Sequence, residues 1–154
     1  MRRLTSSNEL CEGGQQRVFP AEVGRLGVVR EFVEATVAGF GADESLVHDA
    51  ALAADEAVCN IIVHGYQRLG GEIELCIARA GSDLVIRIRD RAPAFDPTAY
   101  PAPDLAVSLE QRRPGGLGIY LIRQVMDEVT YRRLPEGGNE LLLVRRTALG
   151  SEAE

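Results

Sequence analysis

Hydrophobic residues recur along this chain with two different spacings. In residues 21–40, 43–67 and 117–126 they return at every third or fourth position, which places them on one face of a helix. Asp43 stands where a carboxylate can cap the second of these segments. The pattern therefore predicts three amphipathic helices.

In five other segments apolar and polar residues alternate, which is typical of strands with one buried face. These segments are residues 17–19, 72–79, 83–90, 129–133 and 140–146. Short glycine-containing turns at 81–82 and 135–138 join the last four segments into antiparallel pairs. We predict an α+β fold, a two-layer sandwich with helices on one face of a mixed, mostly antiparallel sheet.

The remaining segments give the expected limits of the domain. Residues 1–15 and 148–154 are expected to form a flexible arm and a flexible tail around a single domain of residues 16–147. Residues 91–114 contain five prolines and no sustained period. This predicts a loop of unusual length, and such loops often carry function.

Composition narrows the class of protein. The chain has 154 residues and a net charge of −6, which indicates one acidic globular domain and excludes a surface built to hold nucleic acid through its phosphates. No apolar run reaches the roughly 18 residues of a membrane span, and the first residues lack a signal-peptide core. The three cysteines are widely spaced and odd in number. We therefore expect no disulfide framework and a reducing, cytoplasmic location.

All 17 basic residues are arginines. Without lysine the chain has no P-loop, no lysine of the eukaryotic protein-kinase type and no Schiff-base chemistry. If this protein handles a nucleotide, it uses another kind of site.

Three polar residues at steps of four, Glu56, Asn60 and His64, follow one side of the second predicted helix. They flank its apolar face, where a carboxylate, an amide and an imidazole are costly unless they have partners. A bound metal with its anionic ligand would supply partners. The alternative is a half-exposed row that binds nothing.

Two further positions could carry chemistry. Asp90 continues the apolar face of strand 83–90, so its carboxylate needs a donor such as the exocyclic amine of a ligand, or else it caps the following turn. Gly115, Gly116 and Gly118 lie at the start of the third predicted helix, where backbone N–H groups attract phosphate. A flexible loop-to-helix joint is the other interpretation of these glycines.

The three signals follow the order found in the ATP-binding fold shared by gyrase, histidine kinases and mismatch-repair MutL proteins. Within that fold, the chain resembles the bacterial anti-sigma-factor serine/threonine kinases, which are RsbW-like members of the GHKL or HATPase_c superfamily. Their N-box is similar to LAADEAVCNIIVHGY at residues 52–66. Their two glycine boxes are similar to RDRAPAFDP at 89–97 and to GGLGIYLI at 115–122, with MDEV at 126–129. The resemblance spans residues 17–146.

This resemblance implies ATP and Mg²⁺ as the ligands and assigns roles to three residues. Glu56 would accept the proton of the attacking hydroxyl, Asn60 would coordinate Mg²⁺, and Asp90 would bind the adenine amino group. Residues 97–114 would be the ATP lid, with Arg112 or Arg113 near the γ-phosphate. The other positions implied at the nucleotide are His64, Ala92, Phe95, Arg113, Gly115, Gly116, Leu117 and Gly118, with His64 at the phosphates or at the lid.

The resemblance also implies a function and partners. The leading hypothesis is an ATP- and Mg²⁺-dependent serine/threonine protein kinase that phosphorylates a STAS-type anti-sigma-factor antagonist and, in its other state, sequesters a sigma factor. A homodimer is expected to be possible; direct nucleic-acid or membrane partners are not expected. One alternative is a regulatory binding module of the same fold that uses ATP weakly or not at all. Another is the ATP domain of a histidine kinase cut from a longer chain.

Two departures from the family pattern bear on this hypothesis. Ala92 and Ala94 stand where relatives have glycines, and residues 137–139 (GGN) replace a threonine that many relatives have before the last strand. A methyl group at Ala92 crowds the approach of adenine and removes the easy use of positive φ. We therefore expect weaker nucleotide binding or a loop of different shape, with Glu56, Asn60 and Asp90 unaffected.

Overall fold

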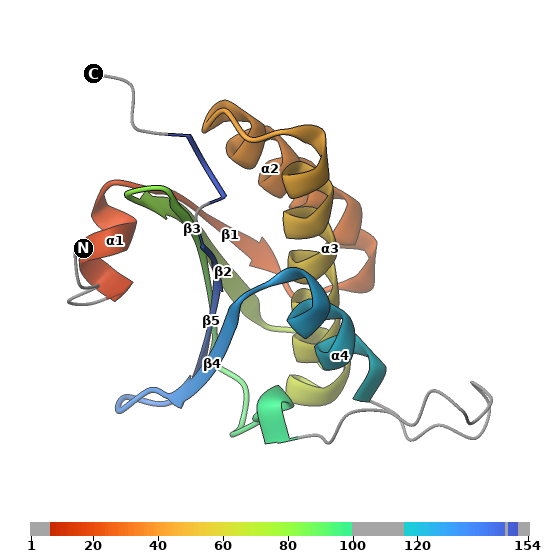
Figure 1. The fold of residues 1–154 in the computed structure, drawn as a ribbon. Helices are drawn as coiled ribbons and strands as arrows, with labels where there is room; N and C mark the ends of the chain where they lie inside the picture. Colours follow the sequence, from red (N-terminus) through yellow and green to blue (C-terminus); the bar gives the residue numbers. More distant parts are fainter. Residues whose placement is uncertain (1–6, 100–115, 147, 151–154) are drawn as a thin grey trace.

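The computed structural model describes residues 7–99, 116–146 and 148–150, and it is built in two layers. A five-stranded sheet forms one layer, and helices α2, α3 and α4 form the other (Figure 1). The strands are β1 (Gln15–Pro20), β2 (Glu72–Ala80), β3 (Asp83–Asp90), β4 (Glu128–Arg133) and β5 (Asn139–Arg145). The helices are α1 (Ser7–Glu12), α2 (Leu26–Gly39), α3 (Glu44–Asn60) and α4 (Gly116–Val125). The predicted α+β sandwich is confirmed.

The strand order in the sheet is β1-β2-β3-β5-β4, and every neighbouring pair is antiparallel. The described strands thus form a fully antiparallel sheet, where a mixed, mostly antiparallel one was expected. The antiparallel order brings the end of β3 beside the start of β5, because Asp90 pairs with Asn139 across the two strands. This pairing positions the site described below.

The predicted helices are present with shifted limits. The first begins only at Leu26, after a 3₁₀ turn at Val23–Arg25. The second begins as predicted, because the Asp43 carboxylate accepts the Leu46 N–H at 2.8 Å. It ends at Asn60 and continues as a π-helical turn at Ile61–Gly65. Such turns occur frequently at functional sites.

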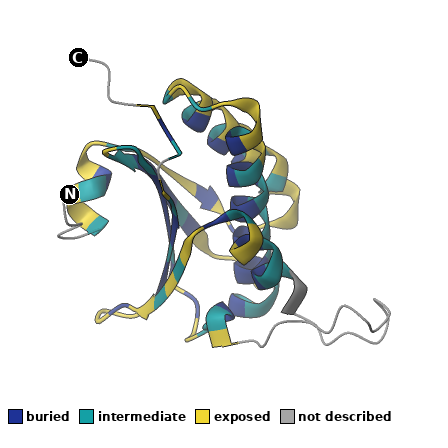
Figure 2. Cartoon of the chain, in the orientation of Figure 1, coloured by how far each residue is buried: buried dark blue, intermediate teal, exposed yellow. Residues whose placement is uncertain are grey.

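The hydrophobic core lies between the sheet and the three helices (Figure 2). Alternate residues of β2 point into it, so that Ile73, Leu75 and Ile77 are fully buried. The buried face of α3 consists largely of alanines, which let this helix approach the sheet closely. Helix α3 packs between α2 and α4 (Figure 1). No described helix is long and apolar enough to cross a membrane.

Helix α1 lies on the face of the sheet opposite the other helices (Figure 1). A disulfide joins its Cys11 to Cys76 of β2, across a Cα–Cα distance of 5.9 Å. The expectation of a loose N-terminal arm is wrong for Ser7–Glu12. No disulfide framework was expected from the sequence, yet two of the three cysteines form this one bridge. The spacing of the cysteines in the sequence does not predict this pair, because the two residues are 65 positions apart and come together only in the folded chain.

Buried charges accompany α1 on that outer face. The Arg87 side chain is only 3% exposed, and its guanidinium donates to the Ser7 carbonyl, to Asn8 Oδ1 and to Glu74 Oε1. Ser7 Oγ in turn donates to Glu140. The start of the predicted tail is also fixed, because Leu149 is buried and its N–H donates to the Ser82 carbonyl.

Candidate nucleotide site

The contact between α3 and the start of α4 brings two of the three predicted motifs together. A Cβ placed on Gly118 would lie 3.1 Å from Glu56 Oε2, 3.1 Å from Asn60 Nδ2 and 3.3 Å from Asn60 Oδ1. Glycine at this position therefore lets the first turn of α4 lie directly against both polar side chains. The backbone N–H groups of this first turn lie at the N-terminus of a ten-residue helix. The N-terminus of a helix favours the binding of phosphate.

The π-helical turn that follows Asn60 determines where His64 lies. The imidazole stacks on the Phe95 ring, with centroids 5.8 Å apart and planes inclined by 22°. Phe95 belongs to the loop that leaves the end of β3. His64 therefore contacts this loop, and the stack ties the end of the α3 segment to it.

Asp90 ends β3 with its carboxylate buried at the same end of the sheet. Its Oδ1 accepts the Ala92 N–H at 2.9 Å and Asn139 Nδ2 at 2.8 Å. The turn-capping role considered from the sequence is thus present, carried by one carboxylate oxygen. Oδ2 has no such bond among the described contacts, so one oxygen of Asp90 is left for another donor.

The loop after Asp90 takes a shape that needs no glycine. Ala92 is 1% exposed, and its methyl lies 3.3 Å from the position of a Cβ built on Gly65. Among the described residues that are not glycine, only Gln67 and Arg68 have positive φ, so Ala92 and Ala94 do not. The tyrosine at the end of the π-helical turn fixes the start of this loop, because Tyr66 Oη accepts the Arg91 N–H and donates to the Glu72 carbonyl.

Asn60 and Asp90 line one small cavity between α3 and the sheet, together with Phe95, Pro97 and Asn139. Its volume is about 10 Å³, which is roughly the space of one water molecule. The two polar residues therefore face a common space, and in this conformation that space is closed. Phe95 and Pro97, which come from the loop after β3, form one wall of this space.

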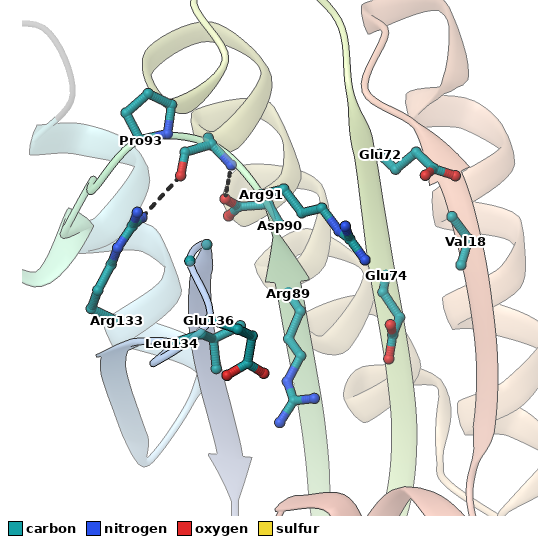
Figure 3. Close-up of a pocket in the computed structure, with 13 residues that line it drawn as sticks. Val18, Glu72, Glu74, Arg89, Asp90, Arg91, Pro93, Arg133, Leu134 and Glu136 are labelled. Atoms are coloured by element: carbon teal, nitrogen blue, oxygen red, sulfur yellow. Dashed lines mark hydrogen bonds between the residues drawn. The ribbon is translucent and has the colours of Figure 1, made fainter.

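A larger cavity of about 650 Å³ lies at the same end of the strands (Figure 3). Its lining includes Glu74 and Arg89, which alternate with core residues and so belong to the outer face of the sheet. Three carboxylates, from Glu72, Glu74 and Glu136, stand among its arginines. This arrangement opposes a triphosphate, so the candidate nucleotide site is the closed cleft beside α3.

Burial changes the proton affinity of both acidic residues in the cleft. Burial is the larger cause that raises the pKa of Glu56, and the neighbouring negative charge of Asp55 raises it further. Burial also raises the pKa of Asp90, while the hydrogen bonds from Asn139 and Ala92 and the charge of Arg133 counteract part of this. A carboxylate with a raised pKa is a stronger proton acceptor, which suits Glu56 to general-base chemistry.

The donor set of the cleft fits a nucleotide-borne Mg²⁺. Among the described residues no three His, Cys, Asp or Glu side chains gather as a metal site. Asn60 offers one amide oxygen beside the Glu56 carboxylate. Mg²⁺ that keeps its waters and binds phosphate oxygens needs only one or two protein ligands of this kind.

The structure thus joins Glu56, Asn60 and Gly118 in one contact and Asn60, Asp90 and Phe95 in one cavity. Gly116 and Leu117 begin α4, and nothing further is described of their side chains. Arg112, Arg113, Gly115 and most of the predicted lid lie outside the described residues. Sequence reasoning noted residues 137–139 only as a departure from the family pattern and assigned no role to Asn139, which begins β5 beside Asp90.

Comparison with known proteins agrees with this geometry. Residues 19–145 match the family model of the histidine kinase-like ATPase domain, and the chain belongs to this family. Within it, the chain is similar to serine-protein kinases and anti-sigma factors of bacteria. The serine/threonine-protein kinase BtrW of Bordetella bronchiseptica is 36% identical over 98 residues, which cover 63% of this chain and 68% of the relative.

Two other relatives point to the same branch, and a solved structure shows the same fold. The serine-protein kinase RsbW of Staphylococcus epidermidis is 31% identical over 73% of this chain and 74% of its own length. The anti-sigma F factor of Clostridium acetobutylicum is 26% identical over 77% of this chain and 85% of its own. The crystal structure of the RsbU and RsbW domains of a Mycobacterium tuberculosis protein matches 92% of this chain with a TM-score of 0.61 and 20% identity. This chain spans a third of that protein, and the likeness shows the fold.

Proposed function

We propose that this chain is an ATP- and Mg²⁺-dependent kinase that phosphorylates a serine or threonine of a STAS-type antagonist and, in its other state, sequesters a sigma factor. The observation that carries the proposal is the convergence of Glu56, Asn60 and Gly118 beside the cavity lined by Asp90. The names of the relatives BtrW, RsbW and anti-sigma F factor support the choice of activity and partners.

Each residue of the cleft has a role in this proposal. Glu56 accepts the proton of the attacking hydroxyl, and Asn60 contributes an amide oxygen to Mg²⁺. Asp90 accepts the amino group of adenine, and the backbone of Gly116 and Gly118 meets the phosphates. The bound Mg²⁺ would neutralise charge on the phosphate oxygens. Phosphoryl transfer needs little more from the protein than this positioning and a base.

Nucleotide binding in this proposal is coupled to opening of the cleft. The stack of His64 on Phe95 and the small cavity describe the closed form. ATP binding must move Phe95 and Pro97, which line this cavity with Asn60, and the contacts of ATP with the protein offset that cost. The affinity is therefore lower than the donor set alone would give, which agrees in direction with the expected effect of Ala92.

The expected compartment is the cytoplasm, where a sigma factor and its antagonist act. Exposed apolar side chains at Val18 of β1 and at Val23, 53% and 49% exposed, support self-association through this part of the chain. The closed cleft itself supports a second candidate function, a regulatory module that binds its partners without using ATP. No binding of ATP at millimolar concentration would favour that module.

Phosphate transfer from labelled ATP to the cognate antagonist tests the kinase. The antagonist is identified as the small STAS-type protein that co-purifies with the chain. We expect Mg²⁺-dependent labelling of a serine or threonine by the natural protein and at least a hundredfold loss in Glu56→Gln. Glu34→Gln is the matched control, because Glu34 is an exposed residue of α2. Unlabelled antagonist, or full activity in Glu56→Gln, would reject the proposal.

A further inference from the structure

Asn139 is a buried amide that connects three strands at the mouth of the cleft. It is the first residue of β5, is 4% exposed, and pairs with Asp90 of β3 and with Arg133 of β4. Buried side-chain amides need partners for both their oxygen and their nitrogen. The contacts of Asn139 meet this need completely.

The two ends of the amide face groups of opposite kind. Its Nδ2 carries two hydrogens and lies within hydrogen-bond distance of three acceptors, so one hydrogen is shared: Asp90 Oδ1 at 2.8 Å, the Pro93 carbonyl at 3.1 Å and the Ala92 carbonyl at 3.2 Å. Its Oδ1 accepts from three donors, which are the Tyr131 hydroxyl, the Phe95 N–H and an Arg133 guanidinium N–H. Rotating the amide by half a turn would place its NH₂ group against the three donors and its oxygen against the three acceptors. The hydrogen-bond network therefore fixes one orientation of the amide.

We propose that Asn139 is the positioning residue that aims the Asp90 carboxylate at a purine and shapes the loop 91–95 in place of the missing glycines. This inference rests on the proposed nucleotide-binding function. Three backbone groups of the loop, at Ala92, Pro93 and Phe95, bind the Asn139 side chain. In this chain a side chain thus holds the shape of a loop that has alanines at positions 92 and 94.

The arrangement also predicts which purine is accepted. Asn139 and the Ala92 N–H occupy Asp90 Oδ1, which leaves Oδ2 as a fixed acceptor. Adenine presents an amino donor at its six position, and guanine presents an oxygen there. The Asp90 carboxylate can accept a hydrogen bond from the adenine amino group, whereas it repels the guanine oxygen. Asn139 thereby favours ATP over GTP through the orientation of Asp90.

Titration of the full chain with Mg-ATP and with Mg-GTP, by calorimetry at two pH values, tests this role. In Asn139→Asp a second carboxylate would face Asp90 Oδ1 across the 2.8 Å contact. At pH of about 8 both would carry charge and repel, so we expect ATP affinity to fall roughly tenfold or more. Near pH 5.5 one shared proton restores a donor, so the variant should recover much of the loss.

The wild-type protein should show no such gain at the lower pH. The control is Asn8→Asp, the same exchange at an asparagine that contacts Arg87 on the outer face of the sheet. It should bind both nucleotides as the wild type does. A merely structural role for Asn139 would lower the melting temperature without this pH dependence.

Two results would overturn the inference in distinguishable ways. If the wild type binds ATP and Asn139→Asp binds it equally at both pH values, Asn139 does not orient Asp90. If the wild type binds no ATP at all, the proposed function fails and the inference falls with it. If Asn139→Asp does not fold, Asn139→Ser replaces it in the test, because serine keeps one hydroxyl donor. We then expect weaker ATP binding and a reduced preference for ATP over GTP. Unchanged affinity and unchanged preference would reject the proposed role of Asn139.

Discussion

Gly118 and Asn60 lie so close that a Cβ on Gly118 would come within 3.1 Å of the Asn60 amide nitrogen. The contact joins α4 to α3 and brings the predicted phosphate-binding backbone to the predicted magnesium ligand. It also explains why a glycine stands inside a helix, where this residue usually costs stability relative to alanine.

Gly118→Ala should impair the site and leave the fold intact. The methyl would displace the ends of the Glu56 and Asn60 side chains, which can move, while alanine favours the helix. We expect phosphate transfer to fall at least tenfold and the melting temperature to stay equal or rise. Comparing transfer rate with thermal unfolding checks this. A variant with normal transfer would show that the contact has no functional importance.

Gly138→Ala should have the opposite profile and destabilise the fold. Gly138 has φ of +97°, and a Cβ there would lie 2.2 Å from the Asp90 carbonyl oxygen, which is backbone and has little freedom to move. The expected loss in the free energy of unfolding exceeds about 1 kcal/mol. Urea unfolding measures it. An unchanged unfolding midpoint would contradict the described geometry of the β4–β5 turn.

Removing the charge of Asp55 should shift the pH dependence of phosphate transfer. Glu56 must be ionised to accept a proton, so activity falls as pH drops through its pKa, which burial and then Asp55 raise. In Asp55→Asn this pKa decreases, and the acidic limb of the pH–rate profile moves to lower pH. The lost pair of Asp55 with Arg30 at 3.3 Å is half-exposed and costs little stability.

The control for this shift is Asp49→Asn on the same helix. Asp49 pairs with Arg145 and is not among the groups that raise the pKa of Glu56. Superimposable acidic limbs in Asp55→Asn and the wild type would show that Glu56 is not the base. Because the pKa of Glu56 is raised, its ionised form opposes folding above that pKa, so Glu56→Gln should not lower stability at neutral pH.

The disulfide between Cys11 and Cys76 should contribute strongly to stability under oxidising conditions. It closes a loop of 65 residues, for which loop-closure entropy gives about 4 kcal/mol. Cys11→Ser should therefore unfold at clearly lower urea concentration than the oxidised wild type. Cys59→Ser is the control, because Cys59 is the free cysteine. Equal urea midpoints for oxidised and reduced wild-type protein would contradict this contribution.

The sequence predicted the elements whose signals are local. Alternation located β2 and β3 within a residue, because each has one face in the core. The Asp43 cap fixed the start of α3. Asn60 and Asp90, which the motif order assigned to one site, line the same small cavity, and their roles in nucleotide binding stay predictions.

Features that depend on contacts between distant segments were not predicted. Helix α1 depends on Cys76, Arg87 and Glu140, which lie far along the chain and form its docking surface only once the sheet exists. The stack of His64 on Phe95 depends on the π-helical turn that follows Asn60. The role of Asn139 depends on the β3–β5 register. None of these leaves a periodic signal in the sequence.

The most direct test of the account is a calorimetric titration of Mg-ATP into the wild type and into Asp90→Asn. If the side-chain oxygen of an asparagine at position 90 keeps the hydrogen bond from Asn139 Nδ2, its NH₂ group faces the amino group of adenine. Two donors then oppose each other. We expect the wild type to bind ATP, Asp90→Asn to bind at least tenfold more weakly, and Asp83→Asn, at the other end of β3, to bind normally. Absence of binding to the wild type at millimolar ATP, or equal binding by Asp90→Asn, would contradict the nucleotide site.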